Sequence, residues 1–470
     1  MKSKNILDQI RIEPNEQEDL LRKLQANILK NHGRNYLALL LLQFNERQLA
    51  SVKKILGALN ITSAWQQIKD ANQYAFWRAH KDQLPKPNPM LQSLYLTSLG
   101  YEVLQIEHAP LHSPFTENMA SRALGDTPKE EWEAPFAQDI HGMLLLGNDL
   151  KAELEEKVHE LKKEWEKAIS IIHVQYGSKL INEHKDTIEH FGYVDGISQP
   201  LFLASDFHKK KTAQWNAEAP LRTVLVPDPG TNEKNAFGSY LVYRKLEQNV
   251  HAFKTAEKEL AKHLGFAEQE EEMAGALMIG RFENGLPVLK LGSVAEPEAP
   301  SKDNDFNYAI DPDGVRCPFH AHIRRVNPRG DSMRAFQISD QEERSRRIAR
   351  RGITYDEIGR NGNLDYEPES GVGLLFLCFQ SDIEQQFEFI QKMWANNNDF
   401  PRPFTGIDPI IGQGHNRKDI NGKDAEQKWT NIHGEQIPKA LSSFVKLLGG
   451  AYFFAPSLPF IQGLTSPAQA

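Results

Sequence analysis

Histidine and arginine side chains are concentrated in one segment of the sequence, RCPFHAHIRRVNPRGD (316–331). His320 and His322 lie two positions apart, so they would share a face on a strand, and in irregular structure either could bind a metal. Their guanidinium neighbours would pair with carboxylates, including those of a bound ligand. These neighbours are Arg316, Arg324, Arg325 and Arg329. A solvated polar surface is the simpler interpretation, and this segment alone leaves both open.

A single carboxylate stands among glycines in FGYVDGISQP (191–200). Gly192 and Gly196 flank Asp195, and glycine allows the backbone to bend tightly or to approach a ligand closely. Such a carboxylate could transfer protons in a catalytic site. It could equally hold a turn by hydrogen bonding to the backbone. The Gly-x-x-Asp-Gly pattern is therefore a weak signal when it is taken alone.

The densest basic segment is RSRRIARRGITYDEIGRNGN (344–363), with five arginines within its first eight positions. Nucleic-acid binding would require aromatic side chains interleaved with these cations, and there are none among them. The chain as a whole is acidic, with a formal net charge of −8. Two interpretations remain: a solvated helical face, or an arginine directed into a pocket, where it would stabilise developing negative charge.

The composition is that of an ordinary globular protein. The chain has 470 residues, more than one hydrophobic core usually organises, so two domains are expected. Cys317 and Cys378 are too few for a disulfide framework, and their apolar neighbours predict buried, reduced thiols. The first residues lack an apolar signal segment, and the apolar run LALLLL near residue 40 is too short to span a bilayer. A cytoplasmic protein without membrane or nucleic-acid partners is therefore expected.

Hydrophobic patterns predict strands and helices in both halves of the chain. In the first half, strands are expected at 36–44, 139–147 and 171–177, and helices at 46–59 and 149–169. In the second half, strands are expected at 222–228, 238–246 and 371–380, and helices at 245–264, 268–279 and 382–397. The polar stretch 205–220 is expected to be a linker or surface insertion, and the irregular stretch 292–315 a functional loop. These patterns favour an α+β fold of two domains, residues 1–220 and 221–470, with antiparallel sheets and peripheral helices.

Taken in order, the three chemical segments resemble the dye-decolourising peroxidase family, in its longer form known from fungi and some bacteria. The resemblance extends over most of the chain, because further stretches match in the right order. These are LQANILKNHGRN (24–35), LTSLGYEVL (96–104), IHGMLLLG (140–147), NDFNYAIDPDGVRCPF (304–319), GLLFLCFQSDIEQQFEFIQKMWANN (373–397) and GGAYFFAPS (449–457). The resemblance implies two ferredoxin-like domains and a haem b cofactor.

The resemblance also implies roles for individual residues. Asp195 matches the aspartate of the family's GxxDG motif, on the distal side of the haem where peroxide binds, and Arg350 in IARRGI matches the distal arginine. His322 in HIR matches the proximal iron ligand, and Arg329 in NPR matches an arginine that pairs with a haem propionate. Gly196 would let the backbone approach the cofactor.

Two features of the proximal side are less determined. A second carboxylate should accept the other ring N–H of the ligand histidine and raise its basicity. Asp382 in QSDIEQQF is expected in this role, with Glu384 as the alternative. His320 stands where the family often has a small residue, so either histidine stays a candidate ligand. Residues 353–356 are ITYD where the family commonly has Ile-Pro-Tyr-Gly, which would alter an access channel or a surface oxidation site.

The resemblance implies a peroxidase that reduces hydrogen peroxide and oxidises dyes and phenolic compounds in one-electron steps, as a monomer or homodimer. Asp195 would move a proton between the peroxide oxygens, and Arg350 would stabilise the charge that develops as the O–O bond breaks. Large dyes would give electrons to a surface tyrosine or tryptophan, for which Tyr355 and Trp394 are candidates.

Two other functions are compatible with these residues. The first is a non-catalytic haem-binding or haem-delivery protein on the same fold, which would have no need of Asp195 and Arg350. The second is a non-haem metal enzyme that uses His320 and His322, which would require a further carboxylate or histidine as a third ligand.

Overall fold

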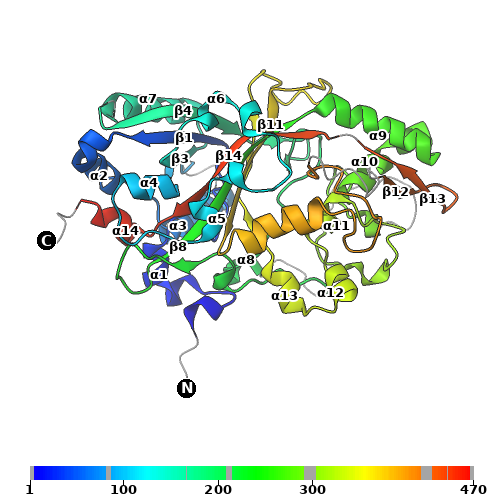
Figure 1. Ribbon diagram of the computed structural model, residues 1–470, viewed down its shortest axis with the longest axis horizontal. Helices are drawn as coiled ribbons and strands as arrows, with labels where there is room; N and C mark the ends of the chain where they lie inside the picture. Colours follow the sequence, from blue (N-terminus) through cyan, green and yellow to red (C-terminus); the bar gives the residue numbers. More distant parts are fainter. Residues whose placement is uncertain are drawn as a thin grey trace.

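A single large antiparallel sheet runs through both halves of the molecule (Figure 1). The computed structural model describes residues 5–80, 86–165, 167–207, 214–290, 303–413, 426–441 and 443–465. Within this part of the chain the sheet has ten strands, eight of which follow the order β10-β11-β8-β14-β2-β3-β1-β4. The short strands β7 (Val226–Pro227) and β9 (Ala349–Arg350) pair with β8 and β11.

The first half of the chain forms a four-stranded unit in the order β2-β3-β1-β4. Its strands are β1 (Tyr36–Phe44), β2 (Leu91–Leu96), β3 (Gly142–Asn148) and β4 (Ile169–Ser178). Its longer helices are α2 (Leu49–Gly57), α3 (Ala64–Ala79) and α7 (Lys151–Trp165). Helices follow β1 and β3, so the unit has the β-α-β-β-α-β order of a ferredoxin-like domain.

The second half repeats this strand order as β10-β11-β8-β14. Its strands are β8 (Phe237–Gln248), β10 (Ile353–Asp356), β11 (Val372–Gln380) and β14 (Val445–Ala455). Helices α9 (Val250–Leu264) and α10 (Glu271–Ile279) follow β8, and two π-helical segments (Glu384–Glu388 and Ile390–Ala395) follow β11. The prediction of an α+β fold with two ferredoxin-like domains is therefore confirmed.

Shorter elements complete the described part of the chain. The helices are α1 (Glu18–Lys23), α4 (Ser98–Val103), α5 (Ser113–Thr116), α6 (Ala134–Ala137), α8 (Ala204–Phe207), α11 (His322–Val326), α12 (Asp331–Phe336), α13 (Asp340–Ser345) and α14 (Leu458–Gly463). The hairpins are β5 (Leu180–Ile181) with β6 (Thr187–Ile188), and β12 (Gln427–Thr430) with β13 (Gln436–Lys439).

The two halves meet at both edges of their sheets. On one side β14 pairs with β2, where Phe454 is opposite Leu96. On the other side the hydroxyl of Thr354 in β10 donates to the carbonyl of Ser178 in β4 and accepts the Leu180 backbone N–H over 3.2 Å. These contacts bring the two ends of the strand order together, so the sheets expected for the two domains are continuous with each other.

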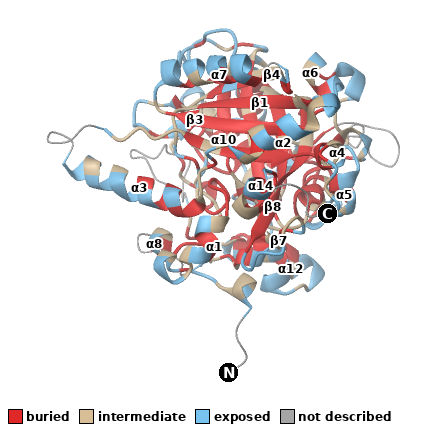
Figure 2. Cartoon of the chain, turned by 90° about the vertical axis from the view of Figure 1, so that its left-hand side faces the viewer, coloured by how far each residue is buried: buried red, intermediate tan, exposed pale blue. Residues whose placement is uncertain are grey.

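Hydrophobic patterning explains why these elements pack as they do. The Leu-rich β1 is almost completely buried because other elements cover both faces of the sheet (Figure 2). Helix α7 buries one stripe, Leu154, Val158, Leu161 and Trp165, at the spacing of an amphipathic helix. Figure 2 shows that α7 presents its other face to solvent, while the strands that it covers are buried.

Several predicted boundaries differ from the structure. The strand predicted at 222–228 is reduced to β7, because residues 221–223 form a helical turn. The helix predicted from 245 begins only at Val250, because β8 continues to Gln248 and the side chain of Asn249 caps the helix. The helix predicted at 382–397 is present but is wound largely as π-helix. Much of the two stretches predicted as linker and loop, residues 208–213 and 292–302, lies outside the described residues.

The segment that carries Asp195 packs on the second half of the molecule. Phe191 and Tyr193 belong to the same hydrophobic cluster as Val250 and Phe253 of α9. The ring of Phe191 stacks on that of Phe253, with centroids 4.3 Å apart. The segment therefore precedes the second half in sequence but is supported by its core. The domain boundary at residue 220 stays a prediction.

Two further expectations can be compared with the structure. Cys317 and Cys378 are both free and buried, as predicted. Among the described residues, none of the helices combines the length and the apolar character that crossing a membrane would require.

Candidate active site

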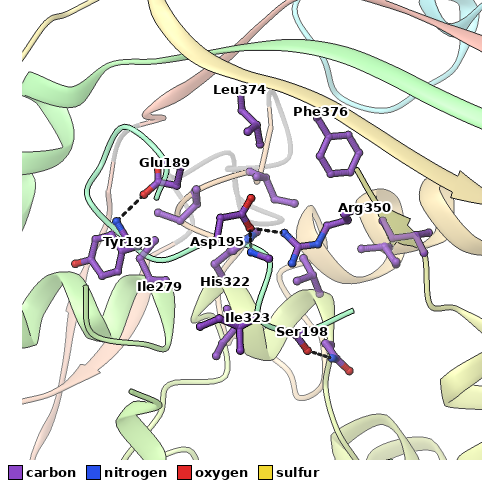
Figure 3. A pocket seen from close by; sticks show the side chains of 18 of the residues that line it. Glu189, Tyr193, Asp195, Ser198, Ile279, His322, Ile323, Arg350, Leu374 and Phe376 are labelled. Carbon is purple, nitrogen blue, oxygen red and sulfur yellow. Dashed lines mark hydrogen bonds and ion pairs between the residues drawn. The ribbon is translucent and has the colours of Figure 1, made fainter. Parts of the chain in front are cut away.

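A cavity lies against the sheet of the second half. Alternate residues of a strand point to the same face, so β8 and β11 present one row of side chains each to this space. The row from β8 consists of Arg244, Leu246 and Gln248, and the row from β11 consists of Leu374 and Phe376. The segment 189–200, helix α11 and the π-helical segments complete the wall (Figure 3). Five of the residues predicted from sequence line it, namely Asp195, Gly196, His322, Arg329 and Arg350.

Asp195 and Arg350 contact each other inside this cavity. Arg350 Nη1 donates to Asp195 Oδ1 over 3.0 Å (Figure 3). The same oxygen accepts the Gly196 backbone N–H over 2.6 Å. Asp195 Oδ2 has no hydrogen-bond partner among the described residues, and the side chain is 30% exposed. One carboxylate oxygen is therefore fixed and the other is available to a ligand.

Strand pairing explains why Arg350 rather than Arg351 reaches the cavity. β9 pairs with β11, and the Arg350 backbone N–H donates to Gln199 Oε1 over 3.0 Å. The next side chain along an extended segment points the other way. Accordingly, Arg351 is buried and donates to the carbonyls of Asn27 and Ile28, over 2.9 and 2.8 Å. Arg351 has a structural role outside the cavity.

The backbone around Asp195 depends on its two glycines. The Asp195 N–H donates to the Thr187 carbonyl over 3.0 Å, which orients the residue. Gly192 and Gly196 have φ angles of +107° and +78°, a region that L side chains rarely adopt. A Cβ at Gly192 would lie 3.0 Å from Glu283 Oε1, whereas a Cβ at Gly196 would meet no atom within 4 Å. Gly196 therefore leaves open space beside the carboxylate.

His322 is the first residue of α11 and is backed by a buried carboxylate. Its Nδ1 lies 2.9 Å from Asp408 Oδ2. Asp408 is 0% exposed, and its Oδ1 accepts the backbone N–H groups of Ile410 and Ile411 over 2.8 and 3.0 Å. A carboxylate fixed in this way favours a proton on Nδ1 and leaves Nε2 as a metal ligand. His322 is 23% exposed and lines the cavity.

The prediction that Asp382 contacts His322 is wrong. Asp382 lies directly after β11, accepts a backbone N–H of the first helical turn over 2.8 Å, and is 3.3 Å from His112 Nε2. The alternative, Glu384, is 55% exposed and lies 3.8 Å from Arg122 Nη2, and it does not line the cavity either. A carboxylate between a strand and a helix caps the free N–H groups of the helix, which explains the position of Asp382.

His320 does not share the environment of His322. Its ring packs against Trp429, with centroids 4.2 Å apart, and it is 1% exposed. Burial lowers the pKa of His320 to about 3, so the ring is neutral. Among the described residues, no group of three or more His, Cys, Asp or Glu side chains is arranged to hold a metal ion. The pairing of His320 with His322 in a non-haem metal site therefore has no geometric support.

Three arginines form one edge of the cavity, and two of them, Arg281 and Arg329, are buried. Arg329 is 5% exposed and donates through Nη2 to Ser198 Oγ over 2.9 Å. Arg281 and Arg347 bond to backbone carbonyls, and none of the three makes an ion pair with a carboxylate of the described residues. Burial lowers the pKa of Arg329 to about 9 and that of Arg281 and Arg347 to about 10. A ligand with two carboxylates, such as haem with its propionates, would supply the missing negative charge.

A second acidic group, Glu189, also lines the cavity. Its carboxylate accepts the backbone N–H groups of Phe191 and Tyr193 over 2.9 and 3.0 Å, and it accepts the side-chain amide of Gln248. Despite these donors, burial raises the pKa of Glu189 to about 7. Glu189 therefore closes the turn that precedes Asp195 and titrates near neutral pH.

The two candidates for surface oxidation are both buried. Tyr355 is 0% exposed, and the Lys245 ammonium lies 4.9 Å from its ring centroid. Trp394 is 4% exposed and stacks on Phe400, with centroids 5.4 Å apart. Phe400 in turn stacks on Phe336, which is 55% exposed. Only Trp394 is thus connected to the surface by aromatic packing.

Several residues of the site were missed from the sequence. Asp408 is 86 positions from His322, so no local spacing connects the two. Arg281 and Glu189 are single charged residues without a repeated pattern. Ser198 and Arg347 belong to segments already identified. Their positions close to Asp195 and Arg350 in the sequence were the signal that could have indicated them.

Comparison with known proteins shows which family both halves of the chain match. The family model described as the DyP dimeric alpha+beta barrel domain matches residues 24–179, and the model of the Dyp-type peroxidase C-terminal domain matches residues 206–406. The multifunctional dye peroxidase DyP2 of Amycolatopsis sp. is 38% identical over 467 residues, which cover 95% of this chain and 96% of the relative.

Solved structures give the same result over the whole length. The DyP-type peroxidase of Anabaena sp. superimposes with a TM-score of 0.89 at 37% identity, covering 99% of this chain and 100% of that one. The structure of DyP2 from Amycolatopsis sp. has a TM-score of 0.85 at 35% identity, covering 97% and 99%. Sequence and structure therefore agree along both halves of the molecule, and the chain belongs to the dye-decolorizing peroxidase family.

Proposed function

We propose that this peroxidase holds haem b in the cavity through His322 and activates hydrogen peroxide with Asp195 and Arg350. The observation that carries the proposal is that an aspartate–arginine pair and a carboxylate-backed histidine line the same cavity. The relatives that match most of this chain are named as peroxidases, which favours the proposal over the alternative, a haem-binding or haem-delivery protein without turnover.

The donor set of the cavity matches the chemistry of haem. His322 Nε2 would bind the iron, while Asp408 holds the proton of Nδ1. The side chains of Arg329, Arg281 and Ser198 would hold the propionates. When bound, haem would supply the iron that takes up peroxide and the electrons that cleave the O–O bond. The apolar wall, which includes Leu374 and Phe376, would limit water around the reacting atoms.

Asp195 would act as the proton carrier. Its Oδ2, free of partners among the described residues, would accept a proton from one peroxide oxygen and return it to the other, which leaves as water. Arg350 already contacts Oδ1, so its guanidinium lies beside the transferred proton and would stabilise the negative charge on the departing oxygen. This pair needs no distal histidine.

Asp195→Asn tests the proposal because it keeps size and polarity but cannot take up a proton. In the holoenzyme, the second-order rate constant for the reaction with hydrogen peroxide is followed at the Soret band by stopped flow. We expect the variant to bind haem normally and to react ~10²–10⁴-fold more slowly, the usual effect of losing an acid–base catalyst. An unchanged rate with an unchanged pH profile would assign the chemistry to Arg350 alone.

We propose phenolic compounds and dyes as reductants, each giving one electron at a time. In support, a related dye-decolorizing peroxidase, 26% identical with a TM-score of 0.76, was solved in complex with 2,6-dimethoxyphenol. Small phenols would reach the cavity directly. The expected oligomeric state, a monomer or a homodimer, stays a prediction.

For dyes too large for the cavity, we propose Trp394 as the electron relay. It follows Ile390 and Gln391, which line the cavity, by about one helical turn, and its ring leads through Phe400 to the exposed Phe336. Trp394→Phe should keep the stacking but lose the oxidisable indole. We expect slower turnover of a bulky anthraquinone dye and unchanged turnover of 2,6-dimethoxyphenol. An equal loss for both reductants would contradict a relay role.

A further inference from the structure

Arg325 and Asp408 are two opposite charges buried on the side of the site where His322 lies, and they do not form an ion pair. Both are 0% exposed. Arg325 donates through Nη1 to the Phe400 carbonyl and through Nη2 to the Gly406 carbonyl. Burial lowers the pKa of Arg325 to about 9, and the negative charge of Asp408 is the main effect that opposes this shift. A buried guanidinium directed at two carbonyls has a cost in desolvation that calls for an explanation.

The explanation lies in which segments these contacts connect. Helix α11 begins with His322, and Arg325 is three residues later, so both side chains extend from the same short helix. His322 reaches Asp408, while Arg325 reaches the carbonyl of Gly406, two residues before Asp408. One helix therefore holds the loop 400–408 by the histidine ring and by the guanidinium.

The rest of the loop is anchored to the end of the π-helical segment. The Gly406 N–H donates to the Asn398 carbonyl over 3.2 Å, and the Asp408 N–H donates to the Ala395 carbonyl over 2.9 Å. These bonds fix the backbone of the loop from the side of the π-helical segment, and Gln427 Nε2 of β12 donates to the Ile407 carbonyl over 3.3 Å. Arg325 supplies the contacts from the side of α11, through the carbonyls of Phe400 and Gly406.

We propose that Arg325 is a positioning residue that fixes the loop carrying Asp408, and so determines the strength of the Asp408–His322 hydrogen bond and the electron donation of His322 to the iron. This proposal rests on the proposed role of His322 as the iron ligand. A strong hydrogen bond to Nδ1 raises the basicity of the ring, which favours ferric over ferrous iron. A displaced loop would weaken that bond.

Lysine at position 325 separates geometry from charge. A guanidinium has a planar fork that can donate to two carbonyls at once, whereas an ammonium is a point charge on a flexible stem. Arg325→Lys therefore keeps the positive charge near Asp408 but cannot donate to both loop carbonyls at once. If only the charge mattered, this variant would behave as the parent does.

The test uses holoenzyme with two spectroscopic readouts that do not depend on turnover. These are the iron–histidine stretching frequency of the ferrous state and the midpoint potential of the ferric/ferrous couple. They are measured for the parent, Asp408→Asn, Arg325→Lys and the double variant. Arg360→Lys is the matched control, because Arg360 is 4% exposed and also donates to backbone carbonyls, those of His190, Asn363 and Leu364.

We expect Arg325→Lys to lower the stretching frequency and raise the potential, in the same direction as Asp408→Asn. In the Asp408→Asn background it should add no further shift, since Arg325 acts through Asp408. Arg360→Lys should leave both readouts unchanged. If Arg325→Lys does not fold, Arg325→Gln, which retains one amide donor, is measured in the same way.

Two results would overturn the proposal. One is an Arg325→Lys protein with the frequency and potential of the parent. The other is an equal shift in the presence and absence of the Asp408 carboxylate. His322→Ala distinguishes these failures from a failure of the proposed function: if it kept the histidine-type frequency, the ligand assignment would be wrong, whatever Arg325 does.

Discussion

Asp195 Oδ1 lies 3.0 Å from Arg350 Nη1, although the two residues are 155 positions apart in the sequence. The contact is made because the segment of Asp195 packs on the second half of the molecule, and because β9 directs Arg350 into the same cavity. The pair is preformed, so neither side chain has to be ordered when peroxide enters.

Arg350→Leu should retain haem and lose most of the reaction with peroxide. Removing one preorganised donor that stabilises developing charge typically costs ~10²–10³ in rate. Arg351→Leu is the contrasting variant: its guanidinium holds the carbonyls of Asn27 and Ile28, so it should lower the thermal stability with a much smaller effect on the peroxide rate. Stopped-flow rates and thermal melts of both proteins check this. Equal rate losses would mean that the charge near the peroxide has been assigned to the wrong arginine.

His322→Ala should abolish tight haem binding or shift the Soret band. His320→Ala should keep the parental spectrum, because the ring of His320 packs on Trp429 away from the cavity. Replacing this buried ring by a methyl group leaves a cavity, so the variant should instead lose about 2–4 kcal/mol in its free energy of unfolding, as in other large-to-small core substitutions. Haem titration by absorbance and urea unfolding separate the two effects. A normal Soret band in His322→Ala together with a lost one in His320→Ala would reverse the assignment.

Asp408→Asn and Asp382→Asn compare the carboxylate that contacts His322 with the one predicted from sequence. Loss of such an outer partner typically costs 10–100-fold in metal affinity or activity. We expect this for Asp408→Asn, measured as the rate of haem transfer to apomyoglobin and as the peroxide rate. Asp382→Asn should leave both unchanged, since Asp382 contacts His112 and the helix start. A comparable effect of Asp382→Asn would show that the helix end influences the site.

Gly196→Ala has a close match in Gly434→Ala. Their φ angles are +78° and +79°, and in both a Cβ would meet no atom within 4 Å. Both variants should therefore lose a similar free energy of unfolding, about 1–2 kcal/mol for the left-handed backbone. Only Gly196 lines the cavity, so only Gly196→Ala should also slow the peroxide reaction. If the two alanine variants reacted with peroxide equally fast, the space beside Asp195 would have no part in catalysis.

Glu189→Gln should change how stability depends on pH. Burial raises the pKa of Glu189 from its ordinary 4.5 to about 7, so the folded protein binds this proton more readily than the unfolded chain does. The stability linked to that proton is fully present below pH 4.5 and is lost as the pH rises through about 7. Glutamine does not titrate, so the stability of the variant relative to the parent should increase from about pH 5 to about pH 8, by up to about 3 kcal/mol. Urea unfolding across this range is the measurement, and parallel curves for the two proteins would contradict it.

The fold was accessible from sequence because its elements have strong local signals. The leucine run of β1 and the Lys/Glu-rich helix α7 were predicted nearly to their ends. The joining of the two sheets was not predicted, because it depends on contacts between distant edges such as Thr354 with Ser178. Such contacts leave no periodic pattern in the chain.

The site was predicted where a residue type and a local motif coincide, as for Asp195 and His322. It was not predicted where the partner is set by tertiary structure alone. The resemblance in QSDIEQQF indicated Asp382, but helix capping explains the same residue at the same position. Asp408, in a loop without regular structure, has only its contact with His322 to identify it.

Asp195 lies on the stretch of chain between β4 of the first half and β8 of the second, and it contacts Arg350 of the second half. The two halves are also joined at both sheet edges, so a hinge between them would have to break the pairing of β14 with β2 and the contact of Thr354 with Ser178. Opening the molecule between its halves to admit a bulky reductant would therefore break these edge contacts. Under the proposed function, reductants too large for the cavity would therefore give up their electrons at the outer surface.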